Sequence, residues 1–318
     1  MGSGFAKIFL AGEYAVLQGK MAVVAALDVR ATARVVPHLP DAQEPTAVVK
    51  AVLDSEYHRM NPGTDISVDT TAFYDNLGRK FGIGSSSACL VSSLEAMLEQ
   101  SANRVSLLSG SSPDWQRPSK TLARALELHR QAQCGLGSGA DVLASALGGL
   151  IAVRGAPHAT EVRRLPPTLP PFAILFSHAQ APTIPFLKAV QTLSVWEKNE
   201  FSRIISELGD IASSIVKIMD RGRIISILPL LAGIDASLAK LSPLLKKDVV
   251  TEQHFALKKR AENAGIVAKI CGAGGGDVSL VLSEDGAALR QFVAENAAEL
   301  GYSPLYVSIA PERDWLNG

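Results

Sequence analysis

The chain has 318 residues and a mass of 33.6 kDa, a length that allows two ordinary domains or one large one. Hydrophobic residues make up 47% of it and the mean hydropathy is +0.18, which excludes disorder for most of the chain. Its 31 basic and 31 acidic residues balance, whereas a nucleic-acid-binding protein normally carries a basic excess.

The first half of the chain is predicted to begin with antiparallel strands and to continue with helices. The predicted strands are short apolar runs bounded by glycine or proline, at residues 7–10, 23–27, 31–36, 66–68 and 150–153. Prolines at positions 37, 40 and 45 indicate a loop over 37–48. The predicted helices carry apolar residues every three or four positions: a short one within 45–56, one after Ser86, and two more at 119–133 and 141–148.

Five prolines between residues 155 and 171 mark the best linker candidate in the chain. We therefore expect an N-terminal domain at 1–165 and a C-terminal domain at 166–318. In the second part, the predicted strands lie at 172–176, 277–282 and 305–309, and the predicted helices at 184–220, 222–245, 251–264 and 287–300. This order favours two α+β domains over a regular alternation of strands and helices.

Neither an export signal nor a metal-binding cysteine pattern is found in the sequence. The three cysteines, Cys89, Cys134 and Cys271, are too few and too scattered for a disulfide framework or a C-x-x-C pair. No basic segment followed by an apolar stretch opens the chain, and no uncharged apolar run of about 18 residues occurs. We therefore expect a cytoplasmic protein with no membrane and no nucleic acid among its partners.

Segment 82–88 combines two glycines with three serines at the start of a predicted helix. Gly82 and Gly84 let the backbone turn tightly beside a ligand. A helix N-terminus offers free N–H groups and a partial positive charge, which together bind phosphate. A serine hydroxyl there can also bind Mg²⁺. Plain capping of the helix by a serine is the alternative, and the spacing is not that of a Walker A loop.

Two other glycine-rich segments, and one lysine, carry further signals. Four glycines within five positions of segment 271–277 indicate an anion-binding backbone nest or a close approach between domains. In segment 135–141, Asp141 enters a predicted helix, where it either caps the helix or accepts a proton from a substrate hydroxyl. Lys7 lies inside an apolar strand and faces either solvent or a site.

In this order, the motifs resemble the GHMP kinase superfamily, which is named after galactokinase, homoserine kinase, mevalonate kinase and phosphomevalonate kinase. The resemblance extends from Lys7 to Leu282 and includes all three family motifs. It implies an α+β, two-domain GHMP kinase fold, with an N-terminal domain like ribosomal protein S5 domain 2 and a C-terminal ferredoxin-like domain. ATP and Mg²⁺ are the implied cofactors, with ATP in the groove between the domains.

Several details look like the phosphomevalonate kinase branch. Segment 7–17 is similar to its first motif, Lys80 stands just before the glycine–serine loop, and Asp277 trails the second glycine-rich loop. Mevalonate kinases place a Mg²⁺-binding glutamate eleven residues before the catalytic aspartate, where this chain has Arg130. The resemblance thus implies transfer of the ATP γ-phosphate to a small-molecule substrate, phosphomevalonate, giving diphosphomevalonate. Mevalonate kinase activity and a non-catalytic ligand sensor are the alternatives, and a homodimer is left open.

The resemblance also implies roles for individual residues. In the implied catalytic pair, Asp141 accepts or orients the acceptor's proton, and Lys7 neutralises charge in the transition state. Ser86 is the implied Mg²⁺ ligand. The residues implied to bind the cofactor are Lys80, Gly82, Gly84, Ser85, Ser86, Ser87, Gly272, Gly274 and Gly275. The residues implied to contact the substrate are Glu13, Tyr14, Ser138, Thr183 and Ala273.

Overall fold

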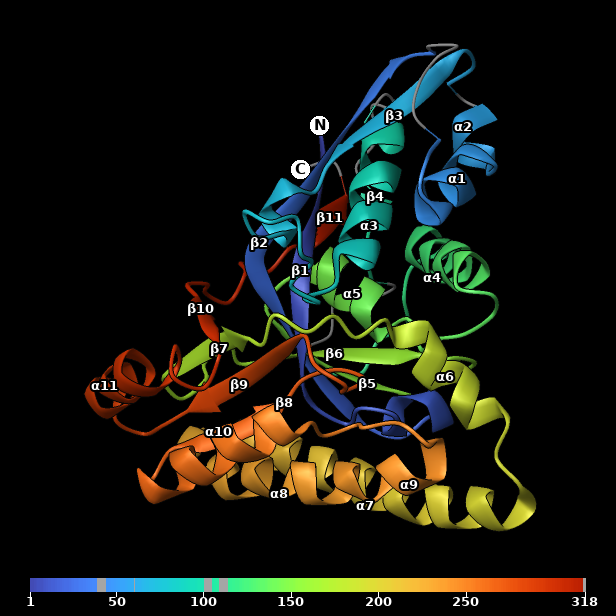
Figure 1. Ribbon diagram of the computed structural model, residues 1–318. Coiled ribbons are helices and arrows are strands. Elements are labelled where there is room, and N and C mark those ends of the chain that lie inside the picture. The colour runs from blue at the N-terminus through green and yellow to red at the C-terminus, as the bar shows by residue number, and fades with distance from the viewer. Residues whose placement is uncertain (39–43, 60, 100–104, 109–113, 317–318) are drawn as a thin grey trace.

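Two antiparallel sheets organise the chain in the computed structural model, which describes residues 1–38, 44–59, 61–99, 105–108 and 114–316 (Figure 1). The strands are β1 (Gly2–Ala11), β2 (Ala22–Pro37), β3 (Thr64–Asp69), β4 (Val105–Ser106), β5 (Leu150–Arg154), β6 (Glu161–Leu165), β7 (Phe172–Phe176), β8 (Val267–Ile270), β9 (Val278–Leu282), β10 (Ser303–Leu305) and β11 (Trp315–Leu316).

The helices of the described residues follow the same numbering along the chain. They are α1 (Ala47–Leu53), α2 (Glu56–Arg59), α3 (Ser85–Leu98), α4 (Lys120–Ala132), α5 (Ala140–Leu147), α6 (Thr183–Gln191), α7 (Val195–Asp220), α8 (Leu228–Ala239), α9 (Leu241–Leu245), α10 (Glu252–Asn263) and α11 (Gly286–Asn296). Three short 3₁₀ helices, η1 (Ala15–Gln18), η2 (Thr71–Phe73) and η3 (Ile224–Ile227), complete the described elements.

The first sheet has the order β1-β2-β5-β6, with β3 also paired to β2. The two runs predicted at 23–27 and 31–36 belong to one long strand, β2, and β1 pairs with it antiparallel as expected. A register shift between Phe5 and Ala6 lets the two strands stay paired along their length. Helix α3 lies directly on β1: a Cβ at Gly4 would come 2.2 Å from the Ala88 carbonyl oxygen, so only glycine permits this approach.

The second sheet has the order β10-β7-β9-β8, and its neighbouring strands pair antiparallel. Its elements follow the sequence strand, helices, strand, strand, helix, strand, which is the ferredoxin-like order. Helices α7, α8 and α10 lie together beneath this sheet in Figure 1. One hydrophobic cluster contains buried side chains of both sheets, among them Ile8, Leu27, Ile174 and Leu280, so the two sheets share a core.

Three expectations from the sequence are corrected in the second half. The proline-rich stretch 155–171 is not irregular throughout, because β6 lies within it and pairs with β5. The helix predicted at 184–220 is two helices, since Ser194 caps α7 in a capping box with Glu197. Strand β8 was not predicted, because its four residues include a lysine. The predicted loop 37–48 lies partly outside the described residues, at 39–43.

The last residues of the described chain return to the first half. The strand predicted at 305–309 ends at Leu305 as β10, and Ile309 then forms a bridge with Leu27. Farther along, the Arg313 guanidinium donates to Ser3 and to Glu95 (2.9 Å), which brings the end of the chain next to its beginning. The predicted boundary between residues 165 and 166 stays a prediction.

The segment Ile224–Leu245 is the one stretch of the described residues that is long and apolar enough to cross a membrane, judged by length and composition. The segment was not predicted from the sequence because only uncharged apolar runs were considered as membrane spans, and it contains Asp235 and Lys240. In the fold, its side chains Leu231 and Leu238 are fully buried in the shared core. Within its most apolar window, 39% is buried inside the protein.

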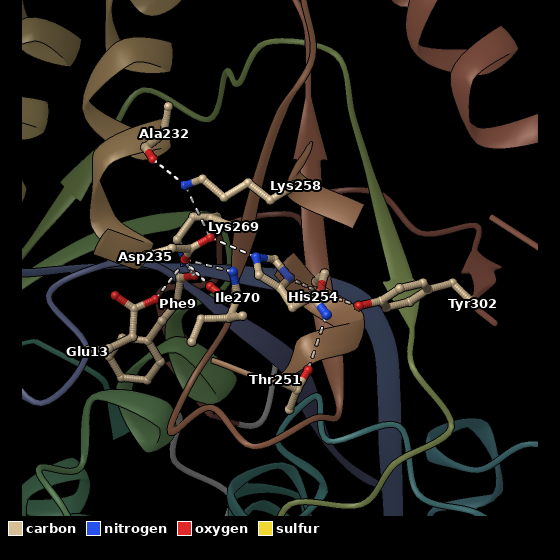
Figure 2. Close-up of polar contacts among 11 residues, drawn as sticks. Phe9, Glu13, Ala232, Asp235, Thr251, His254, Lys258, Lys269, Ile270 and Tyr302 are labelled. Carbon is tan, nitrogen blue, oxygen red and sulfur yellow. Dashed lines mark hydrogen bonds and ion pairs between the residues drawn. The ribbon is translucent and has the colours of Figure 1, made fainter. Parts of the chain in front are cut away.

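A buried polar network ties α8, α10 and the second sheet together (Figure 2). Asp235 Oδ1 accepts from the Ile270 N–H (3.1 Å), and Asp235 Oδ2 lies 2.7 Å from His254 Nε2. A carboxylate only accepts, so Nε2 is the donor, and His254 Nδ1 faces the Ser279 hydroxyl at 2.7 Å. Burial raises the pKa of Asp235, but His254 and the nearby lysines outweigh it and hold that pKa below its usual value.

Asp235→Ala is expected to lower the free energy of unfolding by about 3–5 kcal/mol, the usual cost of breaking a buried pair. The substitution leaves the Ile270 N–H and the His254 ring without an acceptor in the core. Chemical denaturation would measure the change. Asp210→Ala, on the exposed face of α7, is the control and should shift stability by at most about 0.5 kcal/mol. Equal effects of the two substitutions would contradict a structural role for the network.

Candidate active site

A cavity of about 310 Å³ is lined by five segments that are far apart in the sequence. These segments are the end of β1 with the loop after it, and residues 80–86, 133–141, 180–187 and 271–277. All three glycine-rich motifs therefore contribute to one cavity. The strand that carries Lys7 explains its direction: Ile8 is fully buried in the core, whereas Lys7 and Phe9 point to the other side and line the cavity.

Helix α3 presents an uncapped N-terminus to this cavity. Its N-cap is Gly84, at φ +88°, and no side chain at the cap accepts from the N–H groups of the first turn. The alternative in which a serine caps the helix is therefore wrong, and the free N–H groups remain available to an anion. A Cβ at Gly84 would come 2.8 Å from Lys7 Cε, so the glycine also lets the lysine lie against the start of the helix.

Two lysines and one aspartate form a charged group in the cavity wall. Burial lowers the pKa of Lys80, with the positive charge of Lys7 adding to that effect and Asp277 opposing it. Burial raises the pKa of Asp277, against a hydrogen bond from the Ala181 N–H and the charges of Lys7 and Lys80. The two ammonium groups exceed the single carboxylate, so this part of the wall favours an anionic ligand.

The Asp141 carboxylate lies in the first turn of α5. Gly139, and not Asp141, is the N-cap of that helix, so the capping alternative for Asp141 is also wrong. Asp141 Oδ1 accepts from the Val142 N–H (3.0 Å), while Oδ2 lies 3.8 Å from His129 Nε2. The same His129 nitrogen lies 3.3 Å from the Ser86 hydroxyl. His129 thus lies between the start of α3 and the start of α5.

The glycine-rich segment 271–277 is held against the first half of the chain. The Tyr14 hydroxyl donates to the Ala273 carbonyl oxygen at 2.6 Å, and burial raises the pKa of Tyr14 far above its usual value. A Cβ at Gly274, whose φ is +80°, would come 2.1 Å from the Val249 carbonyl oxygen. Close packing therefore requires glycine here, and the loop closes one side of the cavity.

Most of the residues predicted for the site line this cavity. They are Lys7, Glu13, Tyr14, Lys80, Gly82, Gly84, Ser85, Ser86, Ser138, Asp141, Thr183, Gly272 and Ala273. Three predicted cofactor-binding residues do not line it: Ser87, Gly274 and Gly275. Ser87 turns inward and donates to the Gly84 carbonyl oxygen, because its side chain lies on the buried face of α3. Gly274 and Gly275 pack against Val249 and Phe186 instead.

Three residues at or beside the cavity were not predicted to act there. His129 lies in the predicted helix 119–133, and nothing near it in the sequence marks it as a site residue. Lys269 belongs to the unpredicted strand β8, and Cys271 lines the cavity. Burial raises the pKa of Cys271 to about 11, so its thiol is not a nucleophile at neutral pH. Arg130 does not line the cavity and donates to the Pro157 carbonyl oxygen.

The oxygen atoms in the cavity fit a magnesium ion that accompanies a nucleotide. No group of three or more His, Cys, Asp or Glu side chains that could hold a metal occurs among the described residues. Mg²⁺ bound with a nucleotide needs only one or two protein oxygens, because phosphates and water supply the rest. The Ser86 hydroxyl and the Asp141 carboxylate, both in the cavity wall, meet that requirement.

Gly84→Ala is expected to weaken nucleotide binding and to lower the free energy of unfolding by about 1–3 kcal/mol. An alanine there must adopt φ +88° and displace the Lys7 side chain from the start of α3. Gly78→Ala is the matched control, since Gly78 has φ +74° and nothing within 4 Å of its Cβ position. Calorimetric titration with an ATP analogue separates the two. Equal loss of affinity in both variants would contradict a role for the Gly84 position in nucleotide binding.

Comparison with known proteins supports the resemblance through structure. No family model and no curated protein sequence matches the chain. A solved protein from Listeria innocua superposes with a TM-score of 0.77 at 18% identity, covering 98% of each chain. Streptococcus pneumoniae phosphomevalonate kinase, in complex with phosphomevalonate and AMPPNP, gives 0.76 at 18% identity, covering 96% of this chain and 98% of that one. L. major mevalonate kinase, in complex with R-mevalonate, gives 0.66 at 17%, covering 98% and 95%.

These similarities extend over almost the whole length of each chain. The mixed α+β fold of the GHMP kinases, expected from the motifs, is therefore confirmed for this chain.

Proposed function

We propose that this chain is an ATP-dependent kinase of the GHMP superfamily that transfers the γ-phosphate to phosphomevalonate, giving diphosphomevalonate. One observation carries the proposal: the Lys7 amine and the Asp141 carboxylate line the same cavity as the uncapped N-terminus of α3. A non-catalytic sensor would need the anion-binding helix but not this pair. The fold and the complex solved for the pneumococcal phosphomevalonate kinase support the choice of substrate.

In this proposal, the N-terminus of α3 and the backbone of segment 271–277 hold the phosphates of ATP. The free N–H groups of the first turn donate to phosphate oxygens, and the partial positive charge of the helix end adds to the attraction. Ser86 and Asp141 would hold Mg²⁺, which neutralises charge on the β- and γ-phosphates when it is bound. Segment 271–277 closes the cavity from the opposite half of the chain.

The transferred group moves between two oxygens while the chain's charged side chains surround it. The acceptor oxygen bonds to the γ-phosphorus, the bond from that phosphorus to the β,γ-bridging oxygen breaks, and ADP leaves with the electron pair. Asp141 takes the acceptor's proton or orients the acceptor, and Lys7 offsets the negative charge on the transferred group. Phosphoryl transfer depends mainly on positioning and electrostatic stabilisation, so this small set of groups suffices.

Two lysines in the cavity wall, Lys7 and Lys80, support an acceptor that already carries a phosphate. Asp277 offsets part of their charge in the empty site, and the acceptor's phosphate can contact Lys80 when it binds. Arg130, which stands where mevalonate kinases place their glutamate, does not line the cavity and donates to the Pro157 carbonyl oxygen. Lys80 is therefore the proposed ligand of the acceptor's phosphate.

The proposal is tested by measuring ADP release with mevalonate, phosphomevalonate and diphosphomevalonate as acceptors, side by side. We expect turnover with phosphomevalonate and the highest kcat/KM for it. Preference for mevalonate would make the chain a mevalonate kinase. Binding of an ATP analogue without turnover of any acceptor would favour the sensor.

A further inference from the structure

The Lys269 ammonium group is fully buried and contacts Glu13, a residue of the cavity wall (Figure 2). Lys269 is 0% exposed. Its Nζ donates to Glu13 Oε1 (2.6 Å), to the Phe9 carbonyl oxygen (3.2 Å) and to the Ile270 carbonyl oxygen. These three acceptors match the three donors of an ammonium group. Burial lowers the pKa of Lys269, but nearby negative charge, including that of the Glu13 carboxylate it contacts, leaves the net direction upward, so the amine stays charged.

Glu13 connects this ammonium group to the cavity. Glu13 is 2% exposed and lines the cavity, and its Oε1 accepts from Lys269. Its second oxygen, Oε2, is buried and has no hydrogen-bond partner within the described part of the chain. An unsatisfied buried acceptor costs roughly 1–3 kcal/mol, which a ligand that donates to it recovers. A carboxylate oxygen needs a donor, so the matching ligand group is a hydroxyl and not a phosphate oxygen.

The pair also balances charge at the point where the two halves of the chain meet. Glu13 follows β1 in the first sheet, whereas Lys269 lies on β8 in the second, 256 residues away. Together they are neutral, so this wall does not repel an anionic acceptor. Without the ammonium group, Glu13 would be an isolated buried carboxylate, which is costly and would either take a proton or move toward water.

We propose that Lys269 is a positioning residue for the acceptor: it holds the Glu13 carboxylate in the cavity wall so that Oε2 receives a hydroxyl of the acceptor. Lys269 itself does not line the cavity, and it acts through Glu13. This inference rests on the proposed function, because it assumes that the cavity holds an alcohol-bearing acceptor beside the nucleotide.

A double-mutant cycle tests the inference with Lys269→Met, Glu13→Gln and the combination of the two. Methionine keeps the length of the lysine side chain, and glutamine keeps the shape of Glu13 without its charge. The control is Lys258→Met, because Lys258 belongs to the same network, donates to the Ala232 carbonyl oxygen and does not line the cavity. For each variant, kcat, the KM values for phosphomevalonate and ATP, and the melting temperature are measured. Calorimetry with AMPPNP present gives the Kd for phosphomevalonate.

We expect Lys269→Met and Glu13→Gln each to raise the acceptor KM and Kd about tenfold or more, as when a hydrogen bond to a charged group is lost. The KM for ATP should stay close to the wild-type value. The double variant should match Glu13→Gln, since Lys269 has no further effect once the carboxylate is gone. It should also melt above Lys269→Met, because it no longer buries an unpaired charge. Lys258→Met should leave both KM values unchanged.

Three results would overturn the inference, and they are distinguishable. If the wild-type chain neither binds nor phosphorylates an acceptor, the proposed function and this inference fail together. If the wild-type chain turns over phosphomevalonate but Lys269→Met leaves the acceptor KM unchanged, the inference alone fails. Additive effects of the two substitutions in the double variant would likewise show that Lys269 acts through general stability and not through Glu13.

Discussion

Asp141→Asn is expected to lower kcat by roughly 10²–10⁴-fold, the usual contribution of a positioned acid or base. Asparagine keeps the size of the side chain and an oxygen that can accept from the Val142 N–H, so the first turn of α5 is preserved. Asparagine removes the negative charge that faces the acceptor, so the side chain at position 141 can no longer take or attract a proton. The loss should therefore appear in kcat, with thermal unfolding close to that of the wild type.

Single-turnover measurements with preformed enzyme–nucleotide complex isolate this step from product release. Asp54→Asn provides the control, because Asp54 is an exposed carboxylate at the end of α1 and lies outside the cavity. Near-wild-type kcat in Asp141→Asn, with the protein folded, would rule out the role proposed for Asp141.

Lys7→Met is expected to reduce kcat by about 10²–10³-fold, as when one preorganised electrostatic contact to the transition state is removed. The methionine side chain preserves packing against Gly84 and near the Phe9 ring, over which Lys7 Nζ lies at 5.3 Å. The protein should therefore fold normally. The charge of Lys7 also opposes the upward shift of the Asp277 pKa, so its removal should raise that pKa further.

Steady-state assays over a range of ATP concentrations separate the two contributions of Lys7. If the amine acts mainly in the transition state, kcat falls more than the nucleotide affinity does. Lys50→Met, on the exposed face of α1, controls for the loss of a positive charge elsewhere in the protein. Full activity in Lys7→Met would show that the lysine serves only the packing at the start of α3.

Local patterns were sufficient for much of the fold and for most of the cavity. The strand at 172–176 and the helix boundaries near Ser119 and Gly148 follow from periodicity, glycine and capping residues, which act over a few positions. Strand β8 escaped notice because its four residues are stabilised by neighbours from α8, α10 and β9. A lysine such as Lys269 is normally interpreted as solvent-exposed. Only the tertiary structure shows that it pairs with Glu13, 256 residues away.

The choice between capping and ligand binding depended on tertiary geometry. Ser86 and Asp141 stand at positions where either role agrees with the sequence, because both roles use the start of a helix. Glycines occupy the N-caps of α3 and α5, and both side chains line the cavity. His129 shows the opposite case: nothing near it in the sequence marks it, and only the packing of α4 brings its ring to Ser86.

The sequence by itself determined where this chain turns and which stretches are predicted to bind a ligand, because glycine, serine and charged residues act through their own backbone and side-chain chemistry. It also determined the order of the motifs, which pointed to the kinase fold. Only the tertiary structure decided which of these residues meet, since their contacts join positions as far apart as Tyr14 and Ala273. The Lys269–Glu13 pair likewise became apparent only in the tertiary structure. The two residues lie 256 positions apart, and each buried charge needs the other as its partner.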